Sequence, residues 1–357
     1  MIVGVIMAGG KGERFWPLSR INRPKQLINF VGRETLLQES INRIKPMVKG
    51  NNILIATTEE LYHPIKKVIT NFPKENILTE PVGRNTAPCL AMANVYAEQF
   101  DSDPTIVVLT SDHLIWDKNR FREAVKSAVK KAEEEECLVT FGIIVERPDT
   151  GFGYIEREEK VEGNFPVPVY KVKKFIEKPS SKKAKDYMRS GRYFWNSGIF
   201  VWKASSLKNA FKKFSPEIYD FMERLSKHIG KKNEKTMLRK MFYELPSISI
   251  DYAVMEKADN VYVVEGDFGW DDIGAWTALK RIYQPDEDGN VFIGDVVDID
   301  SKNVTIFSNN AIVATLGVKD LVIVSTKDAV LVCPKNRCQD IKMIVNLLRE
   351  KGYKELL

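Results

Sequence analysis

The segment from Ile2 to Lys25 carries the residues of this chain best suited to hold a polyphosphate. A short apolar run, Ile2–Ile6, is rich in β-branched residues, and glycines follow it at Gly9, Gly10 and Gly12. This pattern is typical of a buried strand that ends in a tight turn. Glycine adopts positive φ without strain and has no Cβ, so a phosphate can approach the backbone N–H groups. The segment predicts a phosphate-binding loop.

Two cations stand close to this loop in the sequence. Arg14 offers a planar fork of donors suited to phosphate, and Lys25 offers a point charge. Pro24 has a fixed φ and biases the chain before Lys25 to an extended shape. We therefore expect both cations to be presented to the same anion.

Other phosphate loops fit the sequence poorly. A Walker loop requires a hydroxyl residue after its lysine, but Lys11 is followed by Gly12 and Glu13. A dinucleotide loop requires a third glycine where Phe15 stands. Taken alone, the loop could also be an ordinary glycine-rich turn.

The composition limits the class of protein. The chain has 357 residues, of which 44% are hydrophobic and 29% charged, enough for one large domain and a smaller one. The apolar runs are shorter than a membrane span, and the N-terminal run lacks the basic flank of a signal peptide. We therefore expect a cytoplasmic protein with no membrane partner.

Charge and cysteines exclude two further classes. The net charge of +6 suits anionic substrates, but the basic residues are distributed along the whole chain and balanced by 48 acids, so we expect no nucleic-acid partner. The four cysteines show no zinc spacing and are expected to be reduced. They are Cys89, Cys137, Cys333 and Cys338.

Strand and helix patterns alternate through the first half of the chain. The expected strands are 2–6, 52–56 and 105–109, and the expected helices are 36–44, 61–71, 87–100 and 121–136. Such alternation predicts a doubly wound α/β fold with a mostly parallel sheet. Ligands of these sheets lie beyond the carboxyl ends of strands, where the glycine loop and the pair Ser111–Asp112 fall.

The second half predicts a different organisation. Shorter strands with glycine-rich turns occupy residues 139–200, a polar break follows at 284–289, and short alternating strands continue from 291 to 332. Apolar residues at helical spacing predict a terminal amphipathic helix over 340–356. We therefore expect an α/β domain over 1–282, with two halves that meet at about residue 138, and a small β domain with the terminal helix over 290–357.

The glycine loop and the downstream Pro-Lys resemble those of the sugar-nucleotide pyrophosphorylases, from Met1 to about Ala278. Four separated motifs resemble the mannose-1-phosphate guanylyltransferases in particular: Phe15–Arg20, Arg23–Gln26, Glu80–Pro88 and Phe268–Gly274. The resemblance implies a Rossmann-like fold of the nucleotide-diphospho-sugar transferase type. It also implies that the α/β domain has a nucleotide half at about 1–138 and a sugar half at about 139–282. It also suggests that the small β domain is a short left-handed β-helix.

The same resemblance implies a reaction. GMP would pass from GTP to mannose 1-phosphate by in-line attack on the α-phosphorus, giving GDP-mannose and pyrophosphate. The attacking phosphate is already ionised, so no general base is required. The alternatives are the same chemistry with another nucleoside triphosphate or hexose 1-phosphate, such as glucose 1-phosphate, and a non-catalytic nucleotide-binding subunit.

Carboxylates at two positions are candidate ligands of Mg²⁺. Asp112 follows the apolar run 106–109, whereas Asp271 and Asp272 follow a strand pattern at 261–264. The resemblance makes Asp112 and Asp272 the metal pair, with Asp271 as the alternative. Lys25 is expected to bind the α-phosphate, and Arg14 the β- and γ-phosphates.

Residues for the sugar and the base come from other segments. Lys178 is the candidate for the sugar phosphate and Glu177 for the sugar hydroxyls; on an extended strand both reach one ligand only if the chain bends, which Pro179 favours. By resemblance, Asn196 and the backbone of Gly153 complete this site.

The base is expected to contact a loop together with Ala8 and Ser111. The loop residues are Glu80, Pro81, Gly83, Asn85 and Thr86. Glu80 could accept hydrogen bonds from the guanine edge, although a loop-stabilising carboxylate is equally consistent with the sequence. We also expect a homodimer, with the β domain and the last helix as its contact surface.

Overall fold

A nine-stranded sheet forms the centre of the larger domain in the computed structural model, which describes residues 1–357. The strand order is β3-β2-β1-β4-β9-β6-β10-β8-β7. The strands are β1 (Ile2–Met7), β2 (Ile53–Thr58), β3 (Ile77–Glu80), β4 (Thr105–Thr110), β6 (Leu138–Ile144), β7 (Tyr154–Lys160), β8 (Val169–Ile176), β9 (Tyr193–Lys203) and β10 (Val261–Gly266). A separate two-stranded ribbon pairs β5 (Leu114–Ile115) with β11 (Trp270–Asp271).

Most strands of the sheet run in the same direction. β3, β2, β1 and β4 are parallel neighbours, and β6 is parallel to β10. β9 is antiparallel to β4 and β6, and β8 is antiparallel to β10 and β7. Only β8 and β9 therefore run against the rest, so the prediction of a mostly parallel sheet is confirmed.

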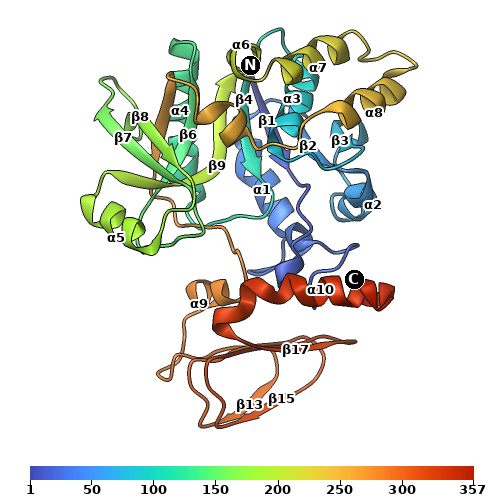
Figure 1. Cartoon of the computed structure of the whole chain (residues 1–357), viewed down its shortest axis with the longest axis vertical. Coiled ribbons are helices and arrows are strands. Elements are labelled where there is room, and N and C mark those ends of the chain that lie inside the picture. Colours follow the sequence, from blue (N-terminus) through green and yellow to red (C-terminus); the bar gives the residue numbers. More distant parts are fainter.

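Helices cover both faces of this sheet (Figure 1). One layer contains α3 (Thr86–Ala97), α6 (Ala204–Phe214), α7 (Pro216–Ser226) and α8 (Glu234–Glu244); the other contains α1 (Leu36–Ile44), α2 (Glu59–Val68) and α4 (Lys118–Glu134). Along β4, Ile106 and Val108 face the first layer, whereas Val107 and Leu109 face the second. Both faces are buried, which explains the continuous apolar strands in the sequence.

The predicted elements of the first half are present, with shifts of a few residues at their ends. The helix at 36–44 has the expected bounds, because Thr35 and Gln38 form a capping box at its start. The helices α6, α7 and α8 were not predicted from the sequence. Another helix, α5 (Ser181–Ser190), lies beside β9. No helix is long and apolar enough to cross a membrane.

The smaller domain is a stack of short strands below the α/β domain (Figure 1). The strands are β12 (Val291–Ile293), β13 (Val296–Ile299), β14 (Thr305–Ser308), β15 (Val313–Leu316), β16 (Leu321–Ser325) and β17 (Val330–Pro334). β12, β14 and β16 form one parallel ladder, and β13 and β15 form another. Successive turns of the chain are thus stacked as in a β-helix.

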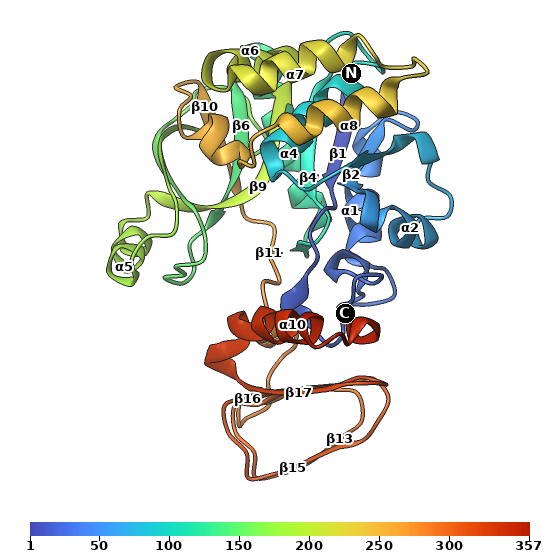
Figure 2. The same ribbon diagram turned by 45° about the vertical axis from the view of Figure 1, so that its right-hand side comes forward.

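The terminal helix lies between the two domains (Figures 1 and 2). This helix, α10 (Ile341–Glu350), is shorter than the predicted 340–356, because the chain continues into a short 3₁₀ turn at Lys354–Leu356. Upstream, α9 (Leu279–Ile282) ends just before the polar break, and β12 begins just after it. The α/β domain and the β stack are therefore joined both by this connection and by α10.

Candidate active site

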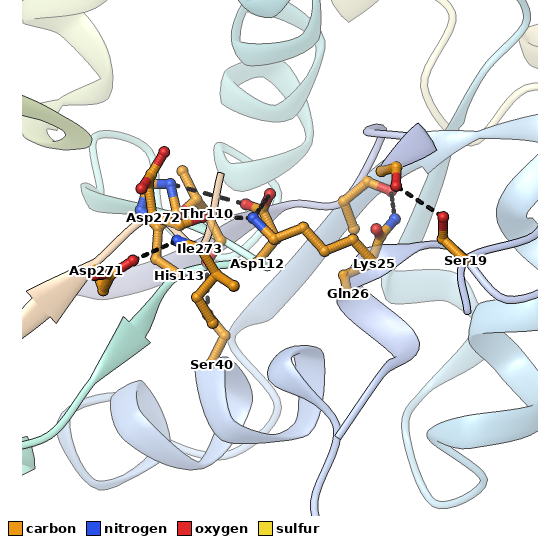
Figure 3. Close-up of polar contacts among 12 residues, drawn as sticks. Ser19, Lys25, Gln26, Ser40, Thr110, Asp112, His113, Asp271, Asp272 and Ile273 are labelled. Carbon is orange, nitrogen blue, oxygen red and sulfur yellow. Dashed lines mark hydrogen bonds and ion pairs between the residues drawn. The ribbon is translucent and has the colours of Figure 1, made fainter. Parts of the chain in front are cut away.

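Lys25 is held at the centre of the site (Figure 3). Its side chain is buried, and its Nζ donates to Oδ2 of Asp112 at 2.9 Å and to the backbone oxygen of Asp272 at 2.5 Å. Asp112 follows β4, and Asp272 follows β11. The three residues that the sequence placed in separate motifs therefore meet.

The glycine loop fixes the position of Lys25. Gly12 has φ of +65°, and a Cβ at this position would lie 2.3 Å from the Cβ of Lys25. Ser19 donates to the backbone oxygen of Gly12 at 2.8 Å. Only Gly12 uses the positive φ that we expected for the loop glycines; Gly9 and Gly10 do not. Around Gly10 there is open space, which leaves room for a phosphate beside the backbone.

A cavity of about 440 Å³ opens beside Lys25. Its lining residues are Lys11, Gly12, Glu13, Arg14, Phe15, Lys25, Asp112, His113, Asp272, Gly274 and Lys342. Arg14 has no ion-pair partner there, so its guanidinium is available to an anion. Lys11 and Glu13 instead pair with Glu60 at 3.0 Å and Arg349 at 3.2 Å.

The acids at this cavity differ in their electrostatics. Burial tends to raise the pKa of Asp112, but the Lys25 ammonium and its hydrogen bond outweigh burial, so this pKa is lowered. The pKa of Asp272 is raised by burial, and the nearby charges of Asp271 and Asp112 add to that effect. A cation beside Asp272 would relieve this destabilisation of its charged form.

Asp271 has a different role from its neighbour. Its carboxylate accepts hydrogen bonds from the Arg281 guanidinium and, at 2.8 Å, from the backbone N–H of Ile273. Asp271 does not line the cavity, whereas Asp272 does. The geometry therefore favours Asp272 over Asp271 as the metal-binding candidate.

A second cavity, of about 290 Å³, contains the predicted sugar residues Gly153, Glu177 and Asn196. A Cβ at Gly153 would lie 2.3 Å from an oxygen of Glu177, so a larger residue would displace that carboxylate. The chain does bend here, with φ of +44° at Lys178. Lys178 is exposed and does not line the cavity, so its contact with the sugar phosphate stays a prediction.

Two further residues at these cavities were missed from the sequence. Asp251 accepts a hydrogen bond from Asn196 Nδ2 at 2.8 Å, and burial raises its pKa. In the sequence, Asp251 is only an isolated acid next to apolar residues, which is a weak indication of a site residue. His113 accepts from Trp270 Nε1 at 3.1 Å, and burial lowers its pKa to about 4. Its signal is that it directly follows Asp112.

Glu80 is buried at the end of β3, beside the predicted base loop. Its Oε1 has no hydrogen-bond partner, and burial raises its pKa to about 7, with an opposing hydrogen bond from Cys89. An unpartnered buried oxygen is costly unless a ligand completes it. This geometry is consistent with the predicted contact to a base.

Other residues of the predicted base site have structural contacts. Asn85, at φ of +66°, caps α3 by accepting from Thr86 N–H, and the Thr86 hydroxyl accepts from Ile250 N–H at 2.8 Å. Thr86 lines the sugar cavity. Gly83 has open space around it, and neither Gly83 nor Pro81 lines the two cavities.

Ala8 and Ser111 are correctly placed at strand ends, but their polar groups are occupied. The Ala8 N–H donates to Ala56, and its oxygen accepts from Gln26 and Thr57 at 3.0 and 2.9 Å. Ser111 N–H donates to Met7, and its side chain is buried. Ala8 anchors the loop to β2 through these bonds, and its contact with the base stays a prediction.

The two cavities meet at His113 and Asp272, which line both. A phosphate loop, buried lysine and carboxylates between two such cavities define a site for joining two phosphorylated substrates, as in a nucleotidyl transferase. In agreement, the family described as "Nucleotidyl transferase" matches residues 3–289. The family described as "MannoseP isomerase/GMP-like beta-helix domain" matches residues 294–348.

Comparison with individual proteins identifies a particular family among the nucleotidyl transferases. The mannose-1-phosphate guanylyltransferase of Escherichia coli K12 is 39% identical over 98% of this chain and 74% of its own length. A putative mannose-1-phosphate guanylyltransferase of Vibrio cholerae is 40% identical over 99% and 76%. The chain belongs to the mannose-1-phosphate guanylyltransferase family.

A solved structure supports the similarity over the whole fold. A protein of Thermus thermophilus, described as a mannose-1-phosphate geranyltransferase, superposes with a TM-score of 0.87 at 35% identity. The match covers 98% of this chain and 99% of that one. Both domains and the terminal helix are therefore shared.

Proposed function

We propose that this chain transfers GMP from GTP to mannose 1-phosphate, giving GDP-mannose and pyrophosphate. The observation that carries the proposal is the meeting of the phosphate and sugar cavities at Asp272, beside Lys25. An ionised sugar phosphate in one cavity would face the α-phosphorus of a triphosphate in the other. Holding two polyanions together is the main demand of this reaction.

Lys25 is the group for the α-phosphate in this proposal. It already lies between Asp112 and Asp272, so its ammonium is oriented before substrate binds. A preorganised cation stabilises developing charge without reorganising during the reaction. Arg14, which has no ion-pair partner, is assigned to the β- and γ-phosphates.

Mg²⁺ fits the carboxylates of this site. The chain offers no cluster of three metal-ligating side chains, but Mg²⁺ is commonly held by one or two carboxylates and substrate phosphates. Asp112 and Asp272 supply two carboxylates in one cavity, and burial, with the nearby charges of Asp271 and Asp112, raises the pKa of Asp272. When bound, Mg²⁺ would neutralise charge on the phosphates.

A substrate panel tests the reaction. Pyrophosphate release is measured for each pairing of four nucleoside triphosphates with mannose 1-phosphate or glucose 1-phosphate. We expect release only when both substrates are present, with the largest kcat/KM for GTP and mannose 1-phosphate. A preference for another pair would retain the chemistry and overturn the specificity, whereas no product with any pair would overturn the proposal.

A homodimer is proposed on the apolar surface of the β stack. Val297 and Ile299 on β13 and Leu316 on β15 are more than half exposed. Such a patch favours a contact surface, and a second copy presents the same patch. Light scattering should give a dimer for the parent, and Leu316→Glu should shift it toward monomer. A monomeric parent would contradict this.

The proposed substrates and the cysteines favour the cytoplasm. All four cysteines are free in the structure, as expected of a protein in a reducing compartment. Fractionation of expressing cells would test this location.

A further inference from the structure

One cation of the phosphate cavity comes from the far end of the chain. Lys342 lines this cavity together with Arg14, Lys25 and the carboxylates, but it belongs to α10, which follows the β stack. None of the sequence motifs includes it. The terminal helix therefore reaches the site that the N-terminal loop builds.

The packing of α10 explains why Lys342 lies there. Figure 2 shows α10 directly below the N-terminal segment of the α/β domain. Ile341 and Val345 on α10 share a buried apolar cluster with Phe15 of the phosphate loop. Trp16 Nε1 donates to the backbone oxygen of Leu356 at 2.8 Å. The helix and the loop thus form one packed unit.

An ion pair extends this unit. Arg349 lies 3.2 Å from Glu13, and both groups are partly exposed, so we expect it to contribute little energy by itself. It adds a polar contact between α10 and the loop to the apolar packing. With Ile341 and Val345 facing the core, Lys342 is turned toward the cavity.

The local chemistry of Lys342 points to an anionic ligand. Lys342 has no carboxylate within ion-pair distance, whereas Lys11 pairs with Glu60 and Lys25 with Asp112. Lys342 also stands in the first turn of α10, where the helix dipole disfavours a cation. Helix stability therefore does not explain it. Arg14 and Lys342 are left as the unpaired cations of the cavity.

We propose that Lys342 binds the β- and γ-phosphates of the triphosphate and the pyrophosphate that they become. This inference rests on the proposed function. In that reaction an oxygen of the sugar phosphate bonds to the α-phosphorus, and the bond from the α-phosphorus to the bridging oxygen breaks. Pyrophosphate leaves with that electron pair, so its charge grows where Arg14 and Lys342 stand. The terminal helix α10 thus supplies a product-binding residue.

Kinetics of the reverse reaction, in which GDP-mannose reacts with pyrophosphate, can distinguish binding of pyrophosphate by Lys342 from a general effect of its positive charge on both substrates. GDP-mannose lacks the leaving phosphates, so removing Lys342 should weaken pyrophosphate alone. For Lys342→Ala, we expect the KM for pyrophosphate to rise about tenfold while the KM for GDP-mannose stays unchanged. Lys351→Ala is the matched control, because Lys351 follows the same helix, is exposed and makes no ion pair. An unchanged pyrophosphate KM, or equal rises in both KM values, would overturn the inference.

Binding measurements distinguish this inference from the proposed function. Pyrophosphate is titrated calorimetrically, with Mg²⁺ present, into the parent, Lys342→Ala and Lys342→Met; the methionine variant retains an apolar stem that packs on the helix. No binding by the parent would contradict the proposed function. Binding by the parent that both variants retain would contradict only the role of Lys342. Lys342→Arg should restore most of the affinity.

Discussion

Gly12 lies so close to Lys25 that a Cβ added at position 12 would clash with the Cβ of Lys25. The clash distance of 2.3 Å and the φ of +65° act together. We therefore expect Gly12→Ala to lower the free energy of unfolding by about 2 kcal/mol or more and to lower kcat/KM at least about tenfold, since Lys25 must move. Urea denaturation and steady-state kinetics measure the two effects.

Gly10→Ala is the stability control for this prediction. Gly10 lacks positive φ, and a Cβ added there would have nothing within 4 Å. We expect its free energy of unfolding to stay within about 0.5 kcal/mol of the parent or to rise slightly. Equal losses in the two variants would show that contact with Lys25 is not what requires Gly12.

Lys25 and Asp272 should be required for turnover, whereas Asp271 should act through its contacts. Lys25→Ala and Asp272→Asn should each lower kcat by about a hundredfold or more, because each removes a charge at the reacting phosphates. Asp272→Asn should also raise the Mg²⁺ concentration needed for half-maximal rate. Asp271→Asn should chiefly weaken stability, since it alters the contact with Arg281.

The metal dependence decides between the two acids. If Asp271→Asn rather than Asp272→Asn shifted the Mg²⁺ dependence, the metal-binding assignment would be reversed. If Lys25→Ala and Asp272→Asn both kept turnover within a few-fold of the parent, neither residue would have the proposed role.

Glu80 should make stability depend on pH. Its pKa is about 7 in the fold, against 4.5 as an ordinary value, so the folded state holds a proton that the unfolded state releases. The free energy of unfolding should therefore fall as pH rises from about 4.5 to about 7, by up to about 3 kcal/mol from this group. Denaturant unfolding of the parent and Glu80→Gln should show that the variant lacks this decrease. Parallel curves would contradict the prediction.

Asp251 should affect the sugar substrate selectively. It orients Asn196 in the sugar cavity, so Asp251→Ala should raise the KM for mannose 1-phosphate about tenfold and leave the KM for GTP unchanged. Asp259→Asn is the control, since the Asp259 side chain is 86% exposed and lies outside the cavity. Equal rises for both substrates would show that Asp251 supports the whole fold rather than the sugar site.

Local sequence patterns determined the strands, the helix and the loop from which the site is built. Continuous apolar strands, the capped helix at 36–44 and the glycine loop were predicted because each depends on neighbouring residues. The order of strand and loop also placed Asp112 at a strand end, since the carboxyl ends of parallel strands share one edge of the sheet.

The tertiary structure alone decided which side chains meet. Asp271 and Asp272 are adjacent, yet only Asp272 lines the phosphate cavity, because Arg281 and the turn hold Asp271 away. Lys178 stays outside the sugar cavity although its neighbour Glu177 lines it. Neighbouring residues of a strand point their side chains in opposite directions, and where the chain bends no local sequence pattern predicts which direction each side chain takes.

In the phosphate loop, too, the sequence determined some features and the tertiary structure decided the others. Its sequence determined a glycine turn with Arg14 and Lys25 nearby. Only the folded structure showed that Lys11 pairs with Glu60 and Glu13 with Arg349. It also showed that Lys342 lines the phosphate cavity. These partners lie far away in the chain: Glu60 is in α2, whereas Arg349 and Lys342 are in α10, which packs against the loop. Long-range packing depends on the whole core, which no short segment of sequence encodes.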